Sequence, residues 1–188
     1  MHKKTLRKKL LEQRNQKSQQ YLIQNSKKIY EKILNFPIFT KSSHILFYVS
    51  YNGEVQTHQL IKKALSMNKN VYVPISESKT HTLKISKLNH FNDLTKGTYG
   101  ILEPKKEKQH IKSIKQIETI LIPGVGFDSN GNRIGQGGGY YDWLISHSTA
   151  TSIGLAFEFQ IKKQIPTEPH DKKIDYIITE KRMINCNR

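Results

Sequence analysis

The sequence has little cysteine, few acidic residues and no long apolar run, and each shortage excludes a class of protein. A single cysteine, Cys186, leaves no partner for an intramolecular disulfide and cannot build a metal site of several thiolates. No apolar run approaches the roughly 20 residues that span a bilayer, and the basic start of the chain has no apolar stretch typical of a signal peptide. We therefore expect a monomeric, cytoplasmic protein without a membrane partner, folded as a single domain over residues 1–188.

The shortage of acidic residues, 15 against 31 lysines and arginines, gives a formal net charge of +16. Residues 1–32 hold ten basic residues and two acidic ones, which makes a basic arm that binds RNA or DNA the natural alternative function. Against it, the chain has 26 lysines but only 5 arginines, and specific recognition of nucleic acid relies strongly on the planar guanidinium. Zinc-finger and ribonucleoprotein motifs are also missing from the sequence. We therefore expect small polyanions, and no nucleic acid, as partners.

What the sequence does have is a glycine-rich segment over residues 122–142, which holds most of the chain's 11 glycines. It follows an apolar run over residues 120–122 that is typical of a buried strand. Glycine lets backbone N–H groups approach an anion closely, so a glycine-rich loop after a strand suits phosphate oxygens. Arg133 adds a cation inside this loop, and Asp142 closes it with a candidate metal ligand. The segment therefore predicts a phosphate site more strongly than it predicts a plain surface loop.

The common nucleotide and calcium motifs do not describe this segment. The P-loop pattern is absent from the chain, and the residues GQGGGY at 135–140 lack the third glycine of the dinucleotide fingerprint. Asp128, Asn130 and Asn132 imitate the start of an EF-hand loop. However, Arg133 stands where that loop needs glycine, and Gly139 where it needs a bidentate glutamate. Residues 128–132 are better explained as a tight turn.

Hydrophobic periodicity along the rest of the chain predicts helices and strands in alternation. The predicted helices cover residues 3–14, 16–34 and 140–146, and another begins at a Thr57 cap with its apolar face on residues 60, 61, 64 and 65. The predicted strands cover residues 45–49, 71–73, 82–88, 117–122, 152–157 and 174–178, with Pro74 ending the second and the third exposed or at an edge. Such alternation predicts a single-domain layered α/β/α fold with a largely parallel, mixed central sheet.

In sheets of this kind, ligands bind outside the carboxyl ends of the strands. Three loops qualify on the predicted strand order: the one that carries Glu54, the glycine-rich loop, and residues 166–171. We expect these loops to converge on one site.

Three stretches of the chain together resemble one known family. PGVGFD at residues 123–128 and GNRIGQGGGYYD at residues 131–142 are similar to the signature of the 5-formyltetrahydrofolate cyclo-ligases. KKTLR at residues 3–7, and the sequence from Pro166 through His170 and Asp171 to Asp175, match in the same order. The resemblance spans nearly the whole chain. It departs at Trp143, where many bacterial members carry an arginine, so a phosphate contact from that position is not expected here.

The resemblance implies an ATP- and Mg²⁺-dependent conversion of 5-formyltetrahydrofolate, with or without a polyglutamate tail, to 5,10-methenyltetrahydrofolate, ADP and phosphate. It implies no dedicated nucleophile or base, because phosphoryl transfer needs mainly positioning and charge stabilisation, here from Arg133 and Tyr140. By resemblance, the folate contacts are Val49, Glu54 and Tyr99, and the metal ligands are Asp142 and Asp171. The residues implied for ATP are Lys3, Lys4, Arg7, Arg133, Ile134, Gly135, Gln136, Gly137, Gly138, Gly139, Tyr140 and Tyr141.

Some alternatives stay open at the level of sequence. Lys3 and Lys4 are hard to separate, although Lys3 and Arg7 are four residues apart and so share a helix face. Asp175 competes with Asp171 as a metal ligand. Sugar-phosphate isomerases and CoA transferases also combine an α/β fold with glycine-rich phosphate loops, and Glu54 could then be the catalytic carboxylate. ATP consumption separates those enzymes from a cyclo-ligase.

Overall fold

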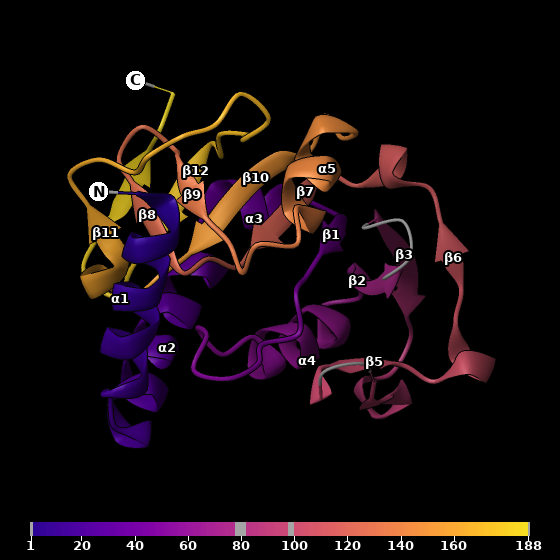
Figure 1. Cartoon of the computed structure of the whole chain (residues 1–188). Coiled ribbons are helices and arrows are strands. Elements are labelled where there is room, and N and C mark those ends of the chain that lie inside the picture. Colours follow the sequence, from indigo (N-terminus) through magenta and orange to yellow (C-terminus); the bar gives the residue numbers. More distant parts are fainter. Residues whose placement is uncertain (1, 78–81, 98–99, 188) are drawn as a thin grey trace.

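The computed structural model describes residues 2–77, 82–97 and 100–187, and its centre is an eight-stranded sheet (Figure 1). The first five strands named below run parallel to one another, and each of the last three pairs antiparallel with the strand inside it, with β13 and β6 at the two edges. The parallel strands in spatial order are β12 (Tyr176–Ile178), β10 (Thr151–Leu155), β7 (Thr119–Ile122), β1 (His44–Leu46) and β2 (Asn70–Glu77). β13 (Met183–Asn185) lies outside β12, and β3 (Thr82–Leu88) and then β6 (Ile111–Lys112) lie outside β2.

Helices cover both faces of this sheet. α2 (Gln19–Leu34), α3 (Pro37–Lys41) and α4 (His58–Ser66) share one apolar core with the sheet, in which Ile29 and Phe39 are fully buried. α5 (Tyr140–Ser146) covers the opposite face, where Leu144 packs in a second core with Ile120 and Phe127. Figure 1 shows α4 below the sheet and α5 above it. The fold is therefore a three-layer α/β/α arrangement around a largely parallel sheet, as the alternation of helices and strands predicted.

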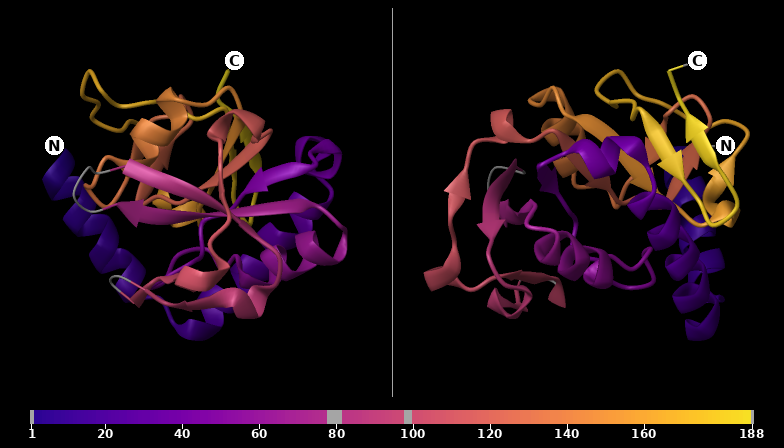
Figure 2. Two further views of the ribbon diagram at one scale, coloured as in Figure 1. Left: turned by 90° about the vertical axis from the view of Figure 1, so that its right-hand side faces the viewer. Right: turned by 180° about the vertical axis from the view of Figure 1, so that it is seen from behind.

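The N-terminal helix α1 (Lys3–Asn15) packs on a smaller sheet instead of on the large one. This sheet has the order β11 (Ile161–Lys162), β8 (Gly126–Asp128) and β9 (Arg133–Ile134). Leu6 and Leu10 of α1 are buried against Val125, Ile134 and Ile165. Both views in Figure 2 show the indigo helix beside the yellow and orange C-terminal half of the chain. This packing places the N-terminal helix beside residues from the last third of the chain.

Several predicted elements agree with the structure and several were wrong. The predicted helix over residues 140–146 has the bounds of α5, and the turn at residues 128–132 joins β8 to β9, with the Asp128 carboxylate accepting hydrogen bonds from the N–H groups of Asn130 and Asn132. β13, the β8–β9 hairpin, α3 and the two-stranded sheet of β4 (Leu94–Lys96) and β5 (Leu102–Pro104) were not predicted. The strand over residues 82–88 is not the edge of the sheet, because β6 pairs outside it.

Pro74 does not end β2, which continues to Glu77. Tyr72 points its backbone carbonyl toward β1, where it accepts a hydrogen bond from the Phe47 N–H, and that pairing ends there. Because alternate residues of a strand face the same neighbour, Pro74 also faces that side, beyond the last pair, where β2 needs no donor.

Thr57 occupies the cap position of α4, but its side chain makes no hydrogen bond to the helix. Its hydroxyl instead donates to the Tyr48 carbonyl and accepts from the Ser50 N–H, which fastens the loop between β1 and α4. Within the described ranges, no helix has the length and apolar character that crossing a membrane requires.

Candidate active site

A cavity of about 660 Å³ lies outside the carboxyl ends of β1 and β7 and is lined by all three of the loops expected to converge. Its volume is in the usual range for a site that takes a small-molecule ligand. The residues that α1 and the segments following β1 and β7 contribute are Lys3, Arg7, Tyr48, Val49, Tyr51, Asn52, Glu54, Pro123 and Gly124. The glycine-rich loop with its flanks, and the 166–171 loop, contribute Arg133, Gly135, Gln136, Gly137, Gly138, Gly139, Tyr140, Tyr141, Asp142, Glu168, His170 and Asp171.

One side of the cavity is cationic and rich in glycine. Arg7 reaches from α1 to the loop, where its Nε donates to the Gly135 carbonyl at 2.8 Å. Gly137 has a φ of +107°, which a residue with a side chain rarely adopts, and a β-carbon there would lie 3.7 Å from the Arg7 guanidinium. Lys3 and Arg133 line the same side. This arrangement of fixed cations and accessible backbone suits a polyanion.

Two of these cations are held by carboxylates of the same cavity. Lys3 Nζ lies 2.5 and 2.6 Å from the two carboxylate oxygens of Asp171, 168 residues away in the sequence. Arg133 Nη2 lies 3.0 Å from Asp142 Oδ2, and the other oxygen of Asp142 accepts the backbone N–H of Lys172. Asp142 is thus tied to the residue that follows Asp171. The two predicted metal ligands lie on adjoining segments, each paired with a predicted phosphate-binding cation.

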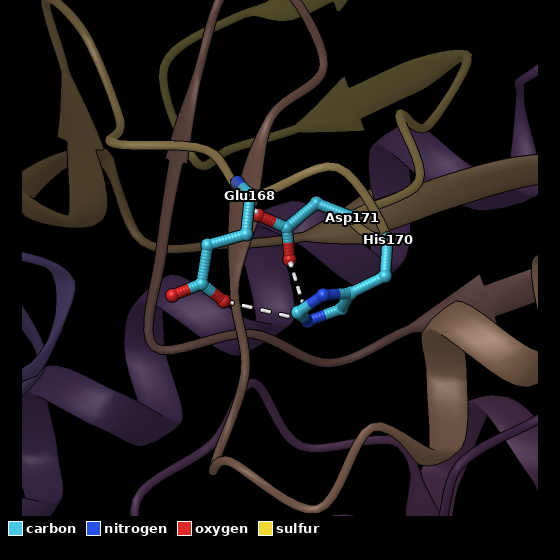
Figure 3. Close-up of side chains that lie close together, drawn as sticks. All are labelled: Glu168, His170 and Asp171. Atoms are coloured by element: carbon cyan, nitrogen blue, oxygen red, sulfur yellow. Dashed lines mark hydrogen bonds and ion pairs between the residues drawn. The ribbon is translucent and has the colours of Figure 1, made fainter.

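Asp171 also belongs to a cluster with Glu168 and His170, shown in Figure 3, in which one ligand atom of each residue lies within 4.8 Å of the others. His170 Nε2 lies 3.4 Å from Glu168 Oε2 and 3.9 Å from Asp171 Oδ1. Burial disfavours the ionised form of Asp171, but hydrogen bonds from Lys3 and from the Glu168 N–H outweigh it and hold the pKa of Asp171 below its usual range. Ionised carboxylate oxygens fit Mg²⁺, which binds to proteins through few carboxylates and keeps several waters.

Glu54 lies in a tight turn after β1. Asn52 and Gly53, the central residues of this turn, have φ values of 45° and 77°, and the Glu54 N–H donates to the Tyr51 carbonyl. Burial raises the pKa of Glu54 to about 7, against the opposing effects of the Tyr51 N–H, which its Oε2 accepts at 3.1 Å, and of the Arg14 guanidinium. A carboxylate with this pKa changes its charge near neutral pH, which is common at functional sites.

Two tyrosines, the buried Tyr48 and the partly buried Tyr141, lie between the Glu54 side of the cavity and its cationic side. Burial, and then the charge of Glu54, raise the pKa of the Tyr141 hydroxyl, so this phenol stays neutral. The Arg133 guanidinium carbon lies 5.7 Å from the centre of the Tyr141 ring. Tyr48 donates its hydroxyl hydrogen to the Val55 carbonyl at 2.8 Å and so supports the loop that carries Glu54.

The remaining wall of the cavity is mostly apolar and would suit a flat heterocycle. Val49, predicted to contact substrate, lines it together with Pro74, Leu83, Ile101 and Leu102. Glu103 and Glu168 also line the cavity, and the sequence did not single them out. Glu168 lies within the 166–171 loop that was predicted to reach the site, so the sequence could have indicated it. Nothing in the sequence indicated Glu103.

The structure shows which of several predicted site residues line the cavity, which the sequence alone could not decide. Lys4 is exposed and Ile134 is fully buried in the core beneath α1, and both lie outside the described lining of the cavity. Asp175 accepts hydrogen bonds from the N–H and hydroxyl of Ser152, away from the cavity, which leaves Asp171 as the carboxylate of this segment within the site. Tyr99 lies outside the described residues. Trp143 stacks on His147 at a centroid distance of 4.6 Å.

Comparison with known proteins agrees with this geometry. The sequence model of the 5-formyltetrahydrofolate cyclo-ligase family matches residues 1–180. A Haemophilus influenzae protein named 5-formyltetrahydrofolate cyclo-ligase is 32% identical over 152 residues, which are 79% of this chain and 81% of that protein. A Mus musculus protein of the same name is 28% identical and covers 95% of this chain and 93% of its own length.

A solved structure has the same fold. The NMR structure of Aquifex aeolicus 5,10-methenyltetrahydrofolate synthetase superposes with a TM-score of 0.89 at 29% identity, over 100% of this chain and 94% of that one. The family match therefore extends over nearly the whole chain and includes every segment that lines the cavity. The chain is an enzyme and belongs to the 5-formyltetrahydrofolate cyclo-ligase family.

Proposed function

We propose that this protein uses ATP and Mg²⁺ to convert 5-formyltetrahydrofolate to 5,10-methenyltetrahydrofolate, with release of ADP and phosphate. The observation that carries the proposal is a single cavity with two chemically different sides. One side offers cations and glycine-rich backbone, and the other offers Glu54 beside an apolar wall. A triphosphate and a folate can therefore meet in one enclosed space, as a reaction between them requires.

On the cationic side, Lys3, Arg7 and Arg133 neutralise the triphosphate, and the backbone of residues 135–139 donates to its oxygens. On the other side, Val49 contacts the folate, and Glu54 accepts hydrogen bonds from its N–H groups.

The reaction steps follow from the chemical difference between 5-formyltetrahydrofolate and 5,10-methenyltetrahydrofolate. The oxygen of the formyl group, whose carbon is bonded to N5, attacks the γ-phosphorus of ATP. The bond between that phosphorus and the bridging oxygen of ADP breaks. N10 then attacks the formyl carbon and loses its proton, the carbon–oxygen bond breaks, and phosphate leaves with the oxygen. Phosphorylation is needed because an amide-like oxygen is otherwise a poor leaving group. The protein contributes positioning and charge neutralisation and needs no side-chain nucleophile.

Asp142 and Asp171 would hold Mg²⁺, because they supply oxygen ligands on adjoining segments of the cavity wall. When bound, this ion neutralises and orients the phosphate oxygens. Lys3 and Arg133, now paired with these carboxylates, become available to the triphosphate when the carboxylates turn to the metal.

The direct test mixes the protein with 5-formyltetrahydrofolate, ATP and MgCl₂ and follows the near-ultraviolet absorbance of the methenyl product. We expect one ADP per product, and no product when ATP or Mg²⁺ is left out. Product formation without ATP would contradict the phosphorylation step.

If no methenyl product forms with any nucleoside triphosphate, the proposed function is wrong. Isomerisation of a sugar phosphate, or CoA transfer, without ATP would then support that class of enzyme. Salt-sensitive retention of RNA or DNA would support the nucleic-acid alternative.

A further inference from the structure

Arg14 is a buried cation to which the proposed chemistry assigns no task. It lies in the last turn of α1 with 3% of its surface exposed. Its Nε and Nη1 atoms are buried and have no hydrogen-bond partner among the residues that the structure describes. Burying an unpaired charge is unfavourable, and the C-terminal end of a helix offsets this cost only in part. A second source of negative charge is therefore expected close to this guanidinium.

The Glu54 turn lies directly against Arg14. A β-carbon built at Gly53 would lie 3.4 Å from Arg14 Cγ and 3.6 Å from its Nε, and the φ of Gly53 is +77°. Glycine therefore permits both the turn and its close contact with the arginine stem. Because Gly53 precedes Glu54, the Arg14 side chain contacts the turn that carries the Glu54 carboxylate, and Glu54 itself lines the cavity.

Three hydrogen bonds hold the loop that carries this turn in place. Ser50 and Thr57 each accept the other's backbone N–H through the side-chain oxygen at 3.0 Å. The Gln56 N–H donates to the Ser26 hydroxyl on α2, also at 3.0 Å. Arg14 and Glu54 interact electrostatically without being one of the described ion pairs.

Among the described groups around Glu54, Arg14 is the one that can offset the negative charge of the Glu54 carboxylate. Tyr48 follows β1 and is buried, and Tyr141 lies on α5 and is partly buried; burial raises the pKa of both phenols, so they carry no charge near neutral pH. Tyr51 contributes its backbone N–H. Arg14 is the positively charged group among these described neighbours.

We propose that Arg14 is a positioning residue of the active site, whose buried positive charge favours the ionised form of Glu54 and thereby its role as the hydrogen-bond acceptor for the N–H groups of the substrate. The proposal rests on the proposed function in that the substrate carries such a donor edge, as a reduced pteridine does. It also gives α1 a second role. Lys3, Arg7 and Arg14 lie on one face of this helix, since 11 residues make three turns, and the same helix thus serves both sides of the cavity.

The test compares Arg14→Met, which keeps the length but removes the charge, with Arg14→Lys, which keeps the charge. Arg182→Met is the matched control, because Arg182 is an exposed arginine paired at 2.7 Å with Glu158 outside this cavity. For each protein, kcat/KM for the folate and for ATP is measured against pH. The carboxyl resonance of Glu54 is also titrated by ¹³C NMR without substrates, with Glu54→Gln to assign it.

We expect Arg14→Met to move the Glu54 titration, and the acidic limb of kcat/KM for the folate, upward by about one pH unit. Since the pKa of Glu54 is about 7, kcat/KM for the folate at pH 7 should fall about fivefold, with the KM for ATP little changed. Arg14→Lys should restore most of the parent profile, and Arg182→Met should keep it. Added to Glu54→Gln, Arg14→Met should have little further effect on the folate KM.

An unchanged Glu54 titration in Arg14→Met would overturn the proposal and make Arg14 a purely structural residue, even if the melting temperature fell. If Arg14→Met does not fold, Arg14→Gln takes its place in both measurements. Failure of the proposed function is distinguishable, because the NMR titration needs no turnover. A shifted titration in a protein that makes no methenyl product would keep the charge relation and remove only the assigned substrate.

Discussion

Glu54 shows how one residue of this protein can be unfavourable for the fold and useful to the site. Burial raises its pKa from 4.5 to about 7, so the folded state favours the neutral acid. Stability from this group is therefore fully present below about pH 4.5 and is lost as the pH rises through 7. At neutral pH and above, the hydrogen bond from the Tyr51 N–H and the positive charge of Arg14 stabilise the ionised form of Glu54.

Glu54→Gln should consequently stabilise the protein at alkaline pH while it weakens folate binding. The amide has nearly the same shape and cannot ionise, so the melting temperature of the variant relative to the parent should increase between pH 5 and pH 8. Each kcal/mol gained in the free energy of unfolding raises the melting temperature by roughly 2–4 °C for a chain of this size. Thermal unfolding of both proteins at both pH values checks this, and an equal difference at the two values would show that Glu54 does not titrate in this range.

Asp171 and Asp175 show what a sequence cannot decide at the scale of one residue. Both are acids in the same short segment, and only tertiary packing separates them: Asp171 meets Lys3 in the cavity, whereas Asp175 binds Ser152. The choice between Lys3 and Lys4 has the same origin, because Lys3 points toward the cavity and Lys4 toward solvent. By contrast, the types of residue needed and the three loops that supply them were predictable from motif and strand order.

We predict that Asp171→Asn and Asp142→Asn reduce turnover by about a hundredfold or more, because each removes a charge that Mg²⁺ would require. Asp175→Asn should instead keep its Mg²⁺ dependence and lose about 1–2 kcal/mol of stability, since its carboxylate accepts two hydrogen bonds from Ser152. Steady-state rates over a Mg²⁺ titration, together with thermal melts, separate the two effects. Full activity in Asp171→Asn would remove that residue from the metal site.

At the scale of elements, the buried strands and amphipathic helices were predictable, and the short strands of the smaller sheet were not. β8, β9 and β11 have two or three residues each, too few for a period of two to stand out from chance. The hairpin of β8 and β9 lies within the glycine-rich segment of residues 122–142, so the segment follows β7 as predicted but its glycines at 135–139 come only after the hairpin. The hairpin matters for function because it contains Arg133, which lies in β9 and is only 6% exposed.

The helix α1 gives a prediction that belongs to the element as a whole. Lys3→Ala and Arg7→Ala should raise the KM for ATP roughly ten- to hundredfold, because each removes a charge-assisted contact of about 1.5–3 kcal/mol, and should change the folate KM far less. Lys4→Ala is the matched control on the same helix, since Lys4 is exposed, and it should be nearly silent. If Lys4→Ala and Lys3→Ala weakened ATP binding equally, α1 would act as a diffuse basic surface and not as part of a defined site.

At the scale of the whole molecule, the net charge of +16 is not repeated inside the cavity. Its lining has the cationic residues Lys3, Arg7 and Arg133 and five acidic residues, Glu54, Glu103, Asp142, Glu168 and Asp171. Two of these cations form close pairs with carboxylates: Lys3 of α1 with Asp171, 168 residues away, and Arg133 of β9 with Asp142 of α5, nine residues away. Two of the three cations are therefore compensated by carboxylates of the same cavity, and an ionic ligand that binds to them must disturb those pairs.

This compensation predicts that Mg²⁺ and ATP stabilise the protein together by more than the sum of their separate effects. ATP alone would draw Lys3 and Arg133 away and leave Asp171 and Asp142 facing phosphate oxygens, whereas Mg²⁺ alone would leave the two cations beside a metal ion. With both ligands bound, each charge has an opposite partner, and a coupling of about 1–3 kcal/mol is typical of such linked sites. Melting temperatures measured without ligand, with each ligand and with both, at equal ionic strength, test this. In the parent the shift with both should exceed the summed single shifts, and in Asp171→Asn the excess should shrink. Purely additive shifts in the parent would mean that these ion pairs do not rearrange when the ligands bind.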